Sequence, residues 1–164
     1  MRISAPIVDS IYAMKEEAVM PKMMKAVRQN AFGGPEVMRY EDAPIPDPGP
    51  GEIRVRVHAV GINPPDWYLR DGYRMLPPEW QPQISFPVIL GTDISGVVDT
   101  VSDDVTGFAP GDDVYAMVRF PSGLAGGSRA YAQYVTVPAS EAAPKPDGID
   151  HVHAAGVPMS LLTA

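Results

Sequence analysis

The clearest pattern in this sequence is a regular alternation of apolar and polar residues over residues 53–59. Apolar residues occupy every second position, which places Arg54, Arg56 and His58 together on the opposite face. Successive side chains of a β-strand point to opposite sides of the sheet. The alternation therefore predicts a strand with one buried face and one solvated face.

Other short apolar runs predict further strands, because each has strand length and is bounded by glycine, proline or other turn residues. Turn signals lie at residues 33–35 and 107–112, while a proline-rich connector spans 43–51 and a loop spans 75–86. The predicted strands are 26–30, 37–41, 88–91, 96–101, 114–118 and 130–137. So many short strands predict a mainly β fold, either a sandwich or a partly open barrel.

Helices are expected to be few and short. Asp66 is a candidate cap for a helix over 67–70, and Asp150 has the position of a cap before 151–156. Residues 161–164 form an apolar helix face that nothing in the sequence covers. We expect further chain, or a partner, to cover this face.

Composition supports this picture and sets apart the first residues. The chain has 15 glycines and 19 prolines among 164 residues, which disfavours long helices and a helical bundle. The run Met23-Met24-Lys25-Ala26-Val27 resembles a natural start, so residues 1–23 are interpreted as a flexible leader. An amphipathic helix over 11–20 is the alternative for this leader.

Charge and targeting signals exclude several classes of partner. The 13 Lys and Arg residues against 20 Asp and Glu give a net charge of −7, which disfavours binding to nucleic acid. No apolar run has the length of a signal-peptide core or a membrane span, so we expect a cytoplasmic protein without a membrane partner. With no cysteine, the chain cannot form disulfides, thiolate metal sites or a thiol nucleophile.

Common catalytic motifs are also missing. Neither G-x-G-x-x-G nor G-x-x-x-x-G-K-[ST] occurs, and there is no G-x-S-x-G elbow. His58 is far in sequence from His151 and His153, so their spacing predicts no metal site. The remaining candidate for a functional site is the segment 61–72, which follows the strand predicted at 53–59 and contains an amide, carboxylates, a phenol and an indole. The alternative for this segment is purely structural, with its polar residues capping a turn and its aromatic residues packing.

Several motifs occur together in the order and spacing of a known superfamily. They are Lys25-Ala26-Val27, the Pro-Gly-Pro-Gly-Glu-Ile-Arg-Val-Arg-Val run at 48–57, Gly-Ile-Asn-Pro-Pro-Asp at 61–66, Gly-Thr-Asp-Ile-Ser-Gly-Val-Val at 91–98 and Pro-Gly-Asp-Asp-Val-Tyr at 110–115. Over residues 24–164 the chain resembles the medium-chain dehydrogenase/reductase superfamily, in its zinc-independent, quinone-oxidoreductase-like branch. The resemblance implies a GroES-like, partly open β-barrel over 24–150. It also implies that 151–164 begin a helical connection to a Rossmann-type nucleotide-binding domain that the sequence lacks.

The resemblance also bears on zinc. Zinc-dependent members have Cys-His where this chain has Asn63-Pro64, and Gly-His-Glu where it has Gly91-Thr92-Asp93. Near the third ligand the chain has Val157-Pro158. The lobe that holds structural zinc is replaced by a short loop at 119–129. The resemblance therefore implies no metal.

The function implied by the resemblance is NADPH-dependent reduction of a quinone or enone by hydride transfer. Asn63 and Asp66 would lie near the nicotinamide ribose, and Thr163 would contact the nicotinamide side of the cofactor. Tyr68 and Tyr73 would line the substrate cleft and donate hydrogen bonds to the acceptor oxygen. Because the nucleotide-binding domain is missing, we expect the 164 residues alone to have negligible activity.

Two alternatives remain beside this reading. The chain could be a stand-alone GroES-like binding or assembly module that uses its uncovered C-terminal face and catalyses nothing. An enoyl-reductase part of a biosynthetic complex would share the chemistry and differ only in the acceptor. The sequence leaves open the choice between NADPH and NADH and whether the chain forms a homo-oligomer.

Overall fold

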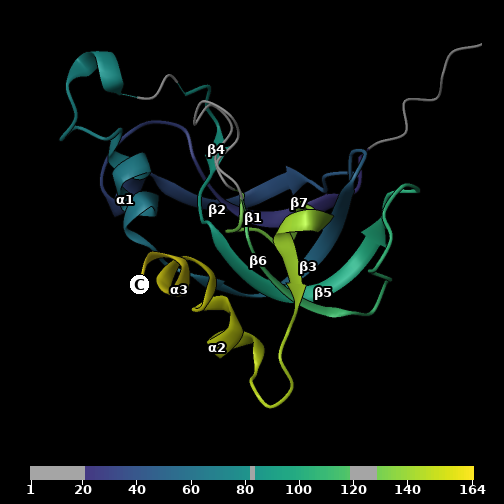
Figure 1. The fold of residues 1–164 in the computed structure, drawn as a ribbon. Helices are drawn as coiled ribbons and strands as arrows, with labels where there is room; N and C mark the ends of the chain where they lie inside the picture. Colours follow the sequence, from purple (N-terminus) through teal and green to yellow (C-terminus); the bar gives the residue numbers. More distant parts are fainter. Residues whose placement is uncertain (1–20, 82–83, 119–128) are drawn as a thin grey trace, which may run out of the picture.

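The computed structural model describes residues 21–81, 84–118 and 129–164, which form two antiparallel sheets with three short helices (Figure 1). The helix considered at 11–20 and all but the end of the 1–23 leader lie outside the described residues. The glycine-rich part of the expected 119–129 loop lies outside them as well. Every strand pair in the described ranges is antiparallel, and the sheets do not close on each other, which confirms the mainly β, partly open fold.

The smaller sheet has the order β2-β1-β4. It consists of β1 (Met23–Gln29), β2 (Met38–Pro44) and β4 (Val88–Ile89). A single 3-10 turn, η1 (Pro35–Val37), connects β1 to β2 at the predicted turn. β2 continues to Pro44 because its whole length pairs with β1, so the start of the expected proline-rich connector is strand.

The larger sheet has the order β7-β3-β5-β6-β8. Its strands are β3 (Glu52–Gly61), β5 (Asp93–Val101), β6 (Asp113–Met117), β7 (Tyr134–Pro138) and β8 (Ala142–Pro144). The predicted alternation in β3 is confirmed, since Ile53 and Val55 are fully buried while Arg56 and His58 are exposed. The short 3-10 turn η3 (Ala139–Glu141) connects β7 to β8.

Residues 130–133 connect the two sheets rather than forming the first half of a strand. Val27 N–H donates to the Tyr131 carbonyl at 2.8 Å, and Val57 N–H donates to the Gln133 carbonyl at 2.9 Å. The segment therefore passes from β1 to β3 before β7 begins. The prediction of one strand over 130–137 was wrong in this half, because the backbone there bonds to two different strands.

The helices are α1 (Pro64–Asp71), α2 (His151–Ala155) and α3 (Pro158–Thr163), with a 3-10 turn η2 (Pro78–Trp80) in the loop after α1. The Asp150 carboxylate accepts the His153 N–H at 2.9 Å, which confirms Asp150 as the cap of α2. α2 packs against β3 and β5, and α3 packs against β6. No helix in the described ranges is long and apolar enough to span a membrane.

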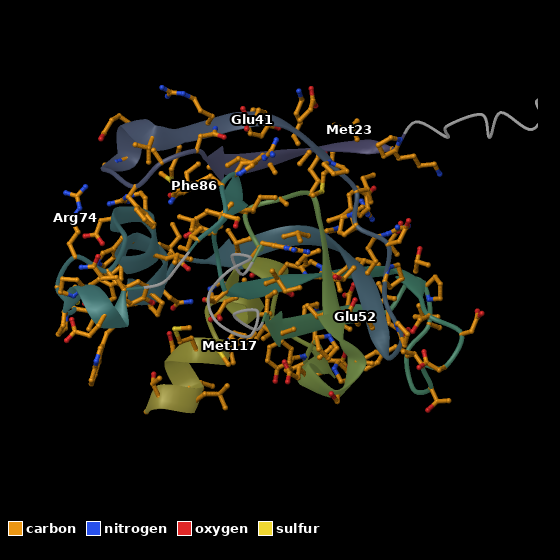
Figure 2. All side chains as sticks on the ribbon, turned by 90° about the horizontal axis from the view of Figure 1, so that it is seen from above. Met23, Glu41, Glu52, Arg74, Phe86 and Met117 are labelled. Atoms are coloured by element: carbon orange, nitrogen blue, oxygen red, sulfur yellow. The ribbon has the colours of Figure 1, made fainter. Side chains whose placement is uncertain are left out.

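α1 and α3 lie at the same end of the molecule (Figure 1). Asp66 and Tyr68 belong to α1, and Thr163 belongs to α3. Figure 2 shows Arg74 and Phe86 at this end, with Met23 and Glu52 toward the opposite end. Met117, at the end of β6, lies beside the C-terminal helices. The sheets thus form a scaffold that presents α1 and α3 together.

Candidate functional site

The candidate site begins where β3 ends and α1 starts. Asn63 is the N-cap of α1, and Asp66 is the third helical residue. The Asp66 carboxylate oxygen Oδ2 accepts the Asn63 N–H at 2.9 Å, and the Asp66 N–H donates to the Asn63 carbonyl at 3.0 Å. The prediction of Asp66 as the cap was wrong, because Pro64 and Pro65 start the helix earlier, at positions where a missing N–H costs nothing.

The Asn63 side chain is used within the protein. Its amide nitrogen Nδ2 donates to the Thr92 hydroxyl oxygen at 2.9 Å. Asn63 is 7% exposed and Thr92 is fully buried. The two side chains therefore satisfy each other between the end of β3 and the start of β5.

Tyr131 is a residue that the sequence analysis did not single out. Its hydroxyl donates to Asp66 Oδ2 at 2.9 Å, across a separation of 65 residues. Asp66 is 4% exposed, and its other oxygen, Oδ1, has no hydrogen-bond partner in the described part of the chain. Burial raises the pKa of Asp66, and the nearby Asp93 raises it further, while the bonds from Asn63 and Tyr131 oppose the shift.

Asp93 is a second buried carboxylate, at the start of β5. Its oxygen Oδ2 accepts the backbone N–H of Met159 in α3 at 2.8 Å. Asp93 is 1% exposed, and burial raises the pKa of its carboxyl. Asn63, Asp66, Thr92, Asp93 and Tyr131 are called here the buried polar cluster.

Tyr68 within α1 and Tyr73, two residues after the end of α1, form a pair. Their ring centroids are 5.9 Å apart, and the Tyr73 N–H donates to the Tyr68 carbonyl at 2.6 Å. Both side chains are half-buried, and Tyr73 packs on an apolar cluster that includes Leu69. Burial, followed by the charge of Asp66, raises the pKa of the Tyr73 phenol. The two tyrosines that were predicted to line the substrate cleft thus lie close together.

Thr163 lies at the end of α3 and is exposed. Its hydroxyl donates to the Met159 carbonyl at 2.8 Å. Met159 in turn is bound to Asp93, so α3 is connected to the buried polar cluster through its first turn. The structure places Thr163 on a helix anchored by the cluster and not in the cluster itself.

A cavity of about 450 Å³ lies between the two sheets. Its lining comes from β1, β2, β3 and residues 130–133 and is mostly apolar. Of the buried polar cluster, only Tyr131 contributes to this lining. None of the site residues predicted from the sequence lines it. Within the ranges that the structure describes, no group of three or more His, Cys, Asp or Glu side chains could hold a metal ion.

Comparison with known proteins agrees with this architecture. The family model for the alcohol dehydrogenase GroES-like domain matches residues 49–147. Quinone oxidoreductase of Sus scrofa is 34% identical over 144 residues, which are 87% of this chain and 40% of that protein. The chain therefore spans less than half the length of this curated relative.

Solved structures give the same result. The quinone oxidoreductase from Coxiella burnetii has a TM-score of 0.75 at 30% identity, covering 87% of this chain and 43% of that one. A native mycobacterial protein complexed with NADPH has a TM-score of 0.68 at 32% identity, covering 85% of this chain and 39% of that one. The resemblance seen in the sequence motifs is confirmed. The chain belongs to the family of alcohol dehydrogenase GroES-like domains, within the medium-chain dehydrogenase/reductase superfamily.

Proposed function

We propose that this chain is the N-terminal substrate domain of an oxidoreductase that reduces quinones or enones with a hydride from NADPH. The observation that carries the proposal is the Tyr68–Tyr73 pair, with Tyr68 on α1 and Tyr73 just after its end, on a helix whose first turn is fixed by the buried polar cluster. The quinone oxidoreductases among the relatives support the acceptor class. We place the protein in the cytoplasm, with a small molecule as its partner.

The two tyrosines supply the chemistry that the acceptor needs. A carbonyl or quinone oxygen gains negative charge as hydride arrives, and a phenol O–H aimed at that oxygen stabilises it. The Tyr73 phenol is protonated at neutral pH and can donate, and burial raises its pKa further. Aromatic rings also favour a flat apolar acceptor, because stacked or edge-on ring contacts add to the burial of apolar area.

The residues present fit a nicotinamide nucleotide. The Oδ1 atoms of Asp66 and Asp93 have no hydrogen-bond partner among the described residues, and ribose hydroxyls are donors of the kind that such oxygens accept. We propose that Asn63 and Asp66 lie near the nicotinamide ribose and that Thr163 contacts the nicotinamide side. NADPH, when bound, supplies the hydride. The mycobacterial relative complexed with NADPH supports this choice of cofactor.

We further propose that the reaction is independent of zinc. Asn63 and Thr92 occupy the positions where zinc-dependent members of the superfamily carry ligands. Here the Asn63 amide donates to the Thr92 hydroxyl at 2.9 Å, so the two groups bond to each other. An N–H donor has no lone pair to offer a cation, and neither side chain is the thiolate or imidazole that zinc prefers.

A chimera tests the proposal. The 164-residue chain is fused to the part of Sus scrofa quinone oxidoreductase that it does not cover, and NADPH oxidation is followed with and without a quinone. We expect quinone-dependent turnover that survives metal chelation. A folded chimera that binds NADPH but reduces neither quinones nor enones would refute the proposed function.

The isolated chain gives a second test. The sequence has no glycine-rich pyrophosphate motif, so we expect negligible NADPH oxidation and weak binding by the 164 residues alone. A fluorescence titration with NADPH measures this. Binding at micromolar concentration would contradict the assignment of the nucleotide site to a separate domain.

A stand-alone binding or assembly module is the second candidate. It is favoured by exposed apolar side chains on the C-terminal helices, where Val152, Leu161 and Leu162 are 72%, 68% and 73% exposed. Large exposed apolar side chains are common at interfaces between proteins. Light scattering after size-exclusion chromatography separates the two candidates, because a module of this kind would assemble through this face without NADPH or quinone.

A further inference from the structure

Two donors from distant parts of the chain converge on one oxygen of Asp66. The Asn63 N–H lies 2.9 Å from Oδ2 and belongs to the same helix start. The Tyr131 hydroxyl also lies 2.9 Å from Oδ2 and comes from the segment that crosses between the sheets. Hydrogen bonds to an ionised carboxylate are among the stronger ones in proteins, so the pair of donors fixes where this carboxylate lies.

Tyr131 is itself held in place by the sheet scaffold. Its N–H donates to the Leu90 carbonyl and its carbonyl accepts the Val27 N–H, both at 2.8 Å. Its ring lies directly against Gly91, which has φ +94°, and a Cβ at residue 91 would collide with the ring. Tyr131 is thus held by backbone hydrogen bonds on both sides and by the close contact of its ring with Gly91. Its hydroxyl therefore has a defined position relative to the sheets.

The first turn of α1 is held through two side-chain bonds, from Asn63 to Thr92 and from Tyr131 to Asp66. The last turn is held separately, because Arg70 bonds to Gln29 and Gly33. Leu69 is the buried apolar residue of the helix and packs with Val88 and Leu90. Asp66 is its buried polar residue and contacts Tyr131. Asp66 and Tyr68 are two residues apart, within one helical turn, so a displacement of the first turn moves the tyrosine pair.

We infer that Tyr131 is a positioning residue for the candidate acceptor site: its hydroxyl holds the Asp66 carboxylate, and through it the first turn of α1 and the Tyr68–Tyr73 pair. The inference rests on the proposed function, because it concerns the placement of the tyrosines that would donate hydrogen bonds to the acceptor. The contacts themselves belong to the 164-residue chain and can be tested without acceptor or cofactor.

The test uses Tyr131→Phe, which removes only the hydroxyl. Tyr40→Phe is the matched control, because Tyr40 lines the same cavity, is 71% exposed and makes no hydrogen bond to Asp66 among the described residues. Three NMR readouts are compared: the pH titration of the Asp66 carboxyl carbon, hydrogen exchange of the Asn63 amide, and the aromatic shifts of Tyr68 and Tyr73.

In Tyr131→Phe we expect the pKa of Asp66 to rise further, because a bond that opposes the effect of burial is lost. We expect the Asn63 amide to exchange roughly tenfold faster, the equivalent of one hydrogen bond. The ring resonances of Tyr68 and Tyr73 should shift, while Tyr40→Phe leaves all three readouts at their wild-type values. If the Tyr131 hydroxyl only stabilised the fold as a whole, its removal would instead speed amide hydrogen exchange evenly, including in the central strands β3 and β5.

An unchanged Asp66 titration with unchanged tyrosine shifts in Tyr131→Phe would overturn the inference, as would an even loss of protection over the whole chain. Asp66→Asn keeps the side-chain shape and provides a second route if Tyr131→Phe folds poorly. Asp66→Asn should move the resonances of Tyr68 and Tyr73 in the same way. In the double variant the shifts caused by the two substitutions should not add. Additive effects would overturn the inference. A folded chimera that binds NADPH but is inactive would refute the proposed function and leave these NMR results standing.

Discussion

The Asp93 carboxylate caps α3 from a neighbouring strand: its Oδ2 accepts the Met159 N–H at 2.8 Å, across 66 residues of sequence. The helix has no side-chain cap of its own, since Val157 stands at its N-cap. The first N–H groups of a helix need an acceptor from outside the helix. A buried residue of β5 therefore sets where α3, and with it Thr163, begins.

Asp93→Ala removes this acceptor. We expect the free energy of unfolding to fall by about 1–2 kcal/mol, the usual effect of losing a helix cap, as measured by urea denaturation. Amide exchange should accelerate in α3 and stay unchanged in α1. Asp93→Asn is the matched control, because its side-chain carbonyl can still accept from Met159. Equal acceleration in both helices would contradict the capping role.

The same carboxylate predicts a pH dependence of stability. Burial raises the pKa of Asp93 above the ordinary value of 3.8, so the folded state holds its proton at a pH where the unfolded state has lost it. This contribution to stability is complete below 3.8 and is lost as the pH rises through the raised pKa. We expect urea denaturation between about pH 4 and pH 7 to show a smaller loss of stability with rising pH in Asp93→Asn than in the wild type.

The sequence predicted the fold where its signal is periodic. The alternation over 53–59 identified β3 because burial of one sheet face imposes that period. β8 was missed because Ala142–Pro144 is too short to carry a period. The segment 130–137 was taken as one strand because apolar composition does not show that its first residues bond to a different strand from the rest.

The site was predictable to the extent that it is contiguous in sequence. Asn63, Asp66 and Tyr68 lie in one loop and helix, and the segment 61–72 pointed to them. Tyr131 was missed because its bond to Asp66 exists only once residues 65 positions apart are packed together. No local sequence pattern marks a hydroxyl that bonds to a carboxylate 65 residues away.

Gly61 allows α2 to pack closely on β3. A Cβ at Gly61 would lie 2.5 Å from the Ala155 carbonyl oxygen, which is backbone and cannot move alone. We expect Gly61→Ala to displace α2 and to lower the free energy of unfolding by about 1–3 kcal/mol, the usual cost of overpacking. Gly49→Ala is the control, because its Cβ would meet nothing nearer than the Glu52 carboxylate at 3.4 Å. Similar thermal stabilities for the two variants would refute this prediction.

His151 connects α2 to the larger sheet through a bond that fixes its tautomer. Its Nδ1 lies 2.8 Å from the oxygen of Ser95, whose hydroxyl donates to the Val114 carbonyl at 2.9 Å. Because the serine proton is already used, Nδ1 of His151 carries the proton in this bond. The other nitrogen, Nε2, lies 3.6 Å from the Asp113 carboxylate.

His58→Gln should raise the pKa of His151. Burial lowers this pKa below 6.5, and the electrostatic effect of His58, whose ring centroid lies 4.5 Å away, lowers it further, against the attraction of Asp113. In the wild type the folded state thus binds fewer protons than the unfolded state, so this contribution to stability is complete above 6.5 and is lost as the pH falls from 6.5 through the lowered pKa. NMR titration of the imidazole measures the shift. His153→Gln, which changes an exposed imidazole bonded to Asp150, should leave the titration of His151 where it was.

Tyr73→Phe tests the donor role in the active chimera. Tyr73 has φ +52°, and phenylalanine bears the same backbone cost, so the change removes the hydroxyl without adding strain. We expect kcat with a quinone to fall about tenfold to a hundredfold, because a donor to the developing oxyanion is lost while the ring that packs on the acceptor remains. KM should change less than kcat, as for an interaction made mainly in the transition state. Tyr40→Phe is the control and should keep the wild-type kcat. If the Tyr73→Phe chimera has the same kcat as this control, Tyr73 is not the donor, and Tyr68 is the next residue to test.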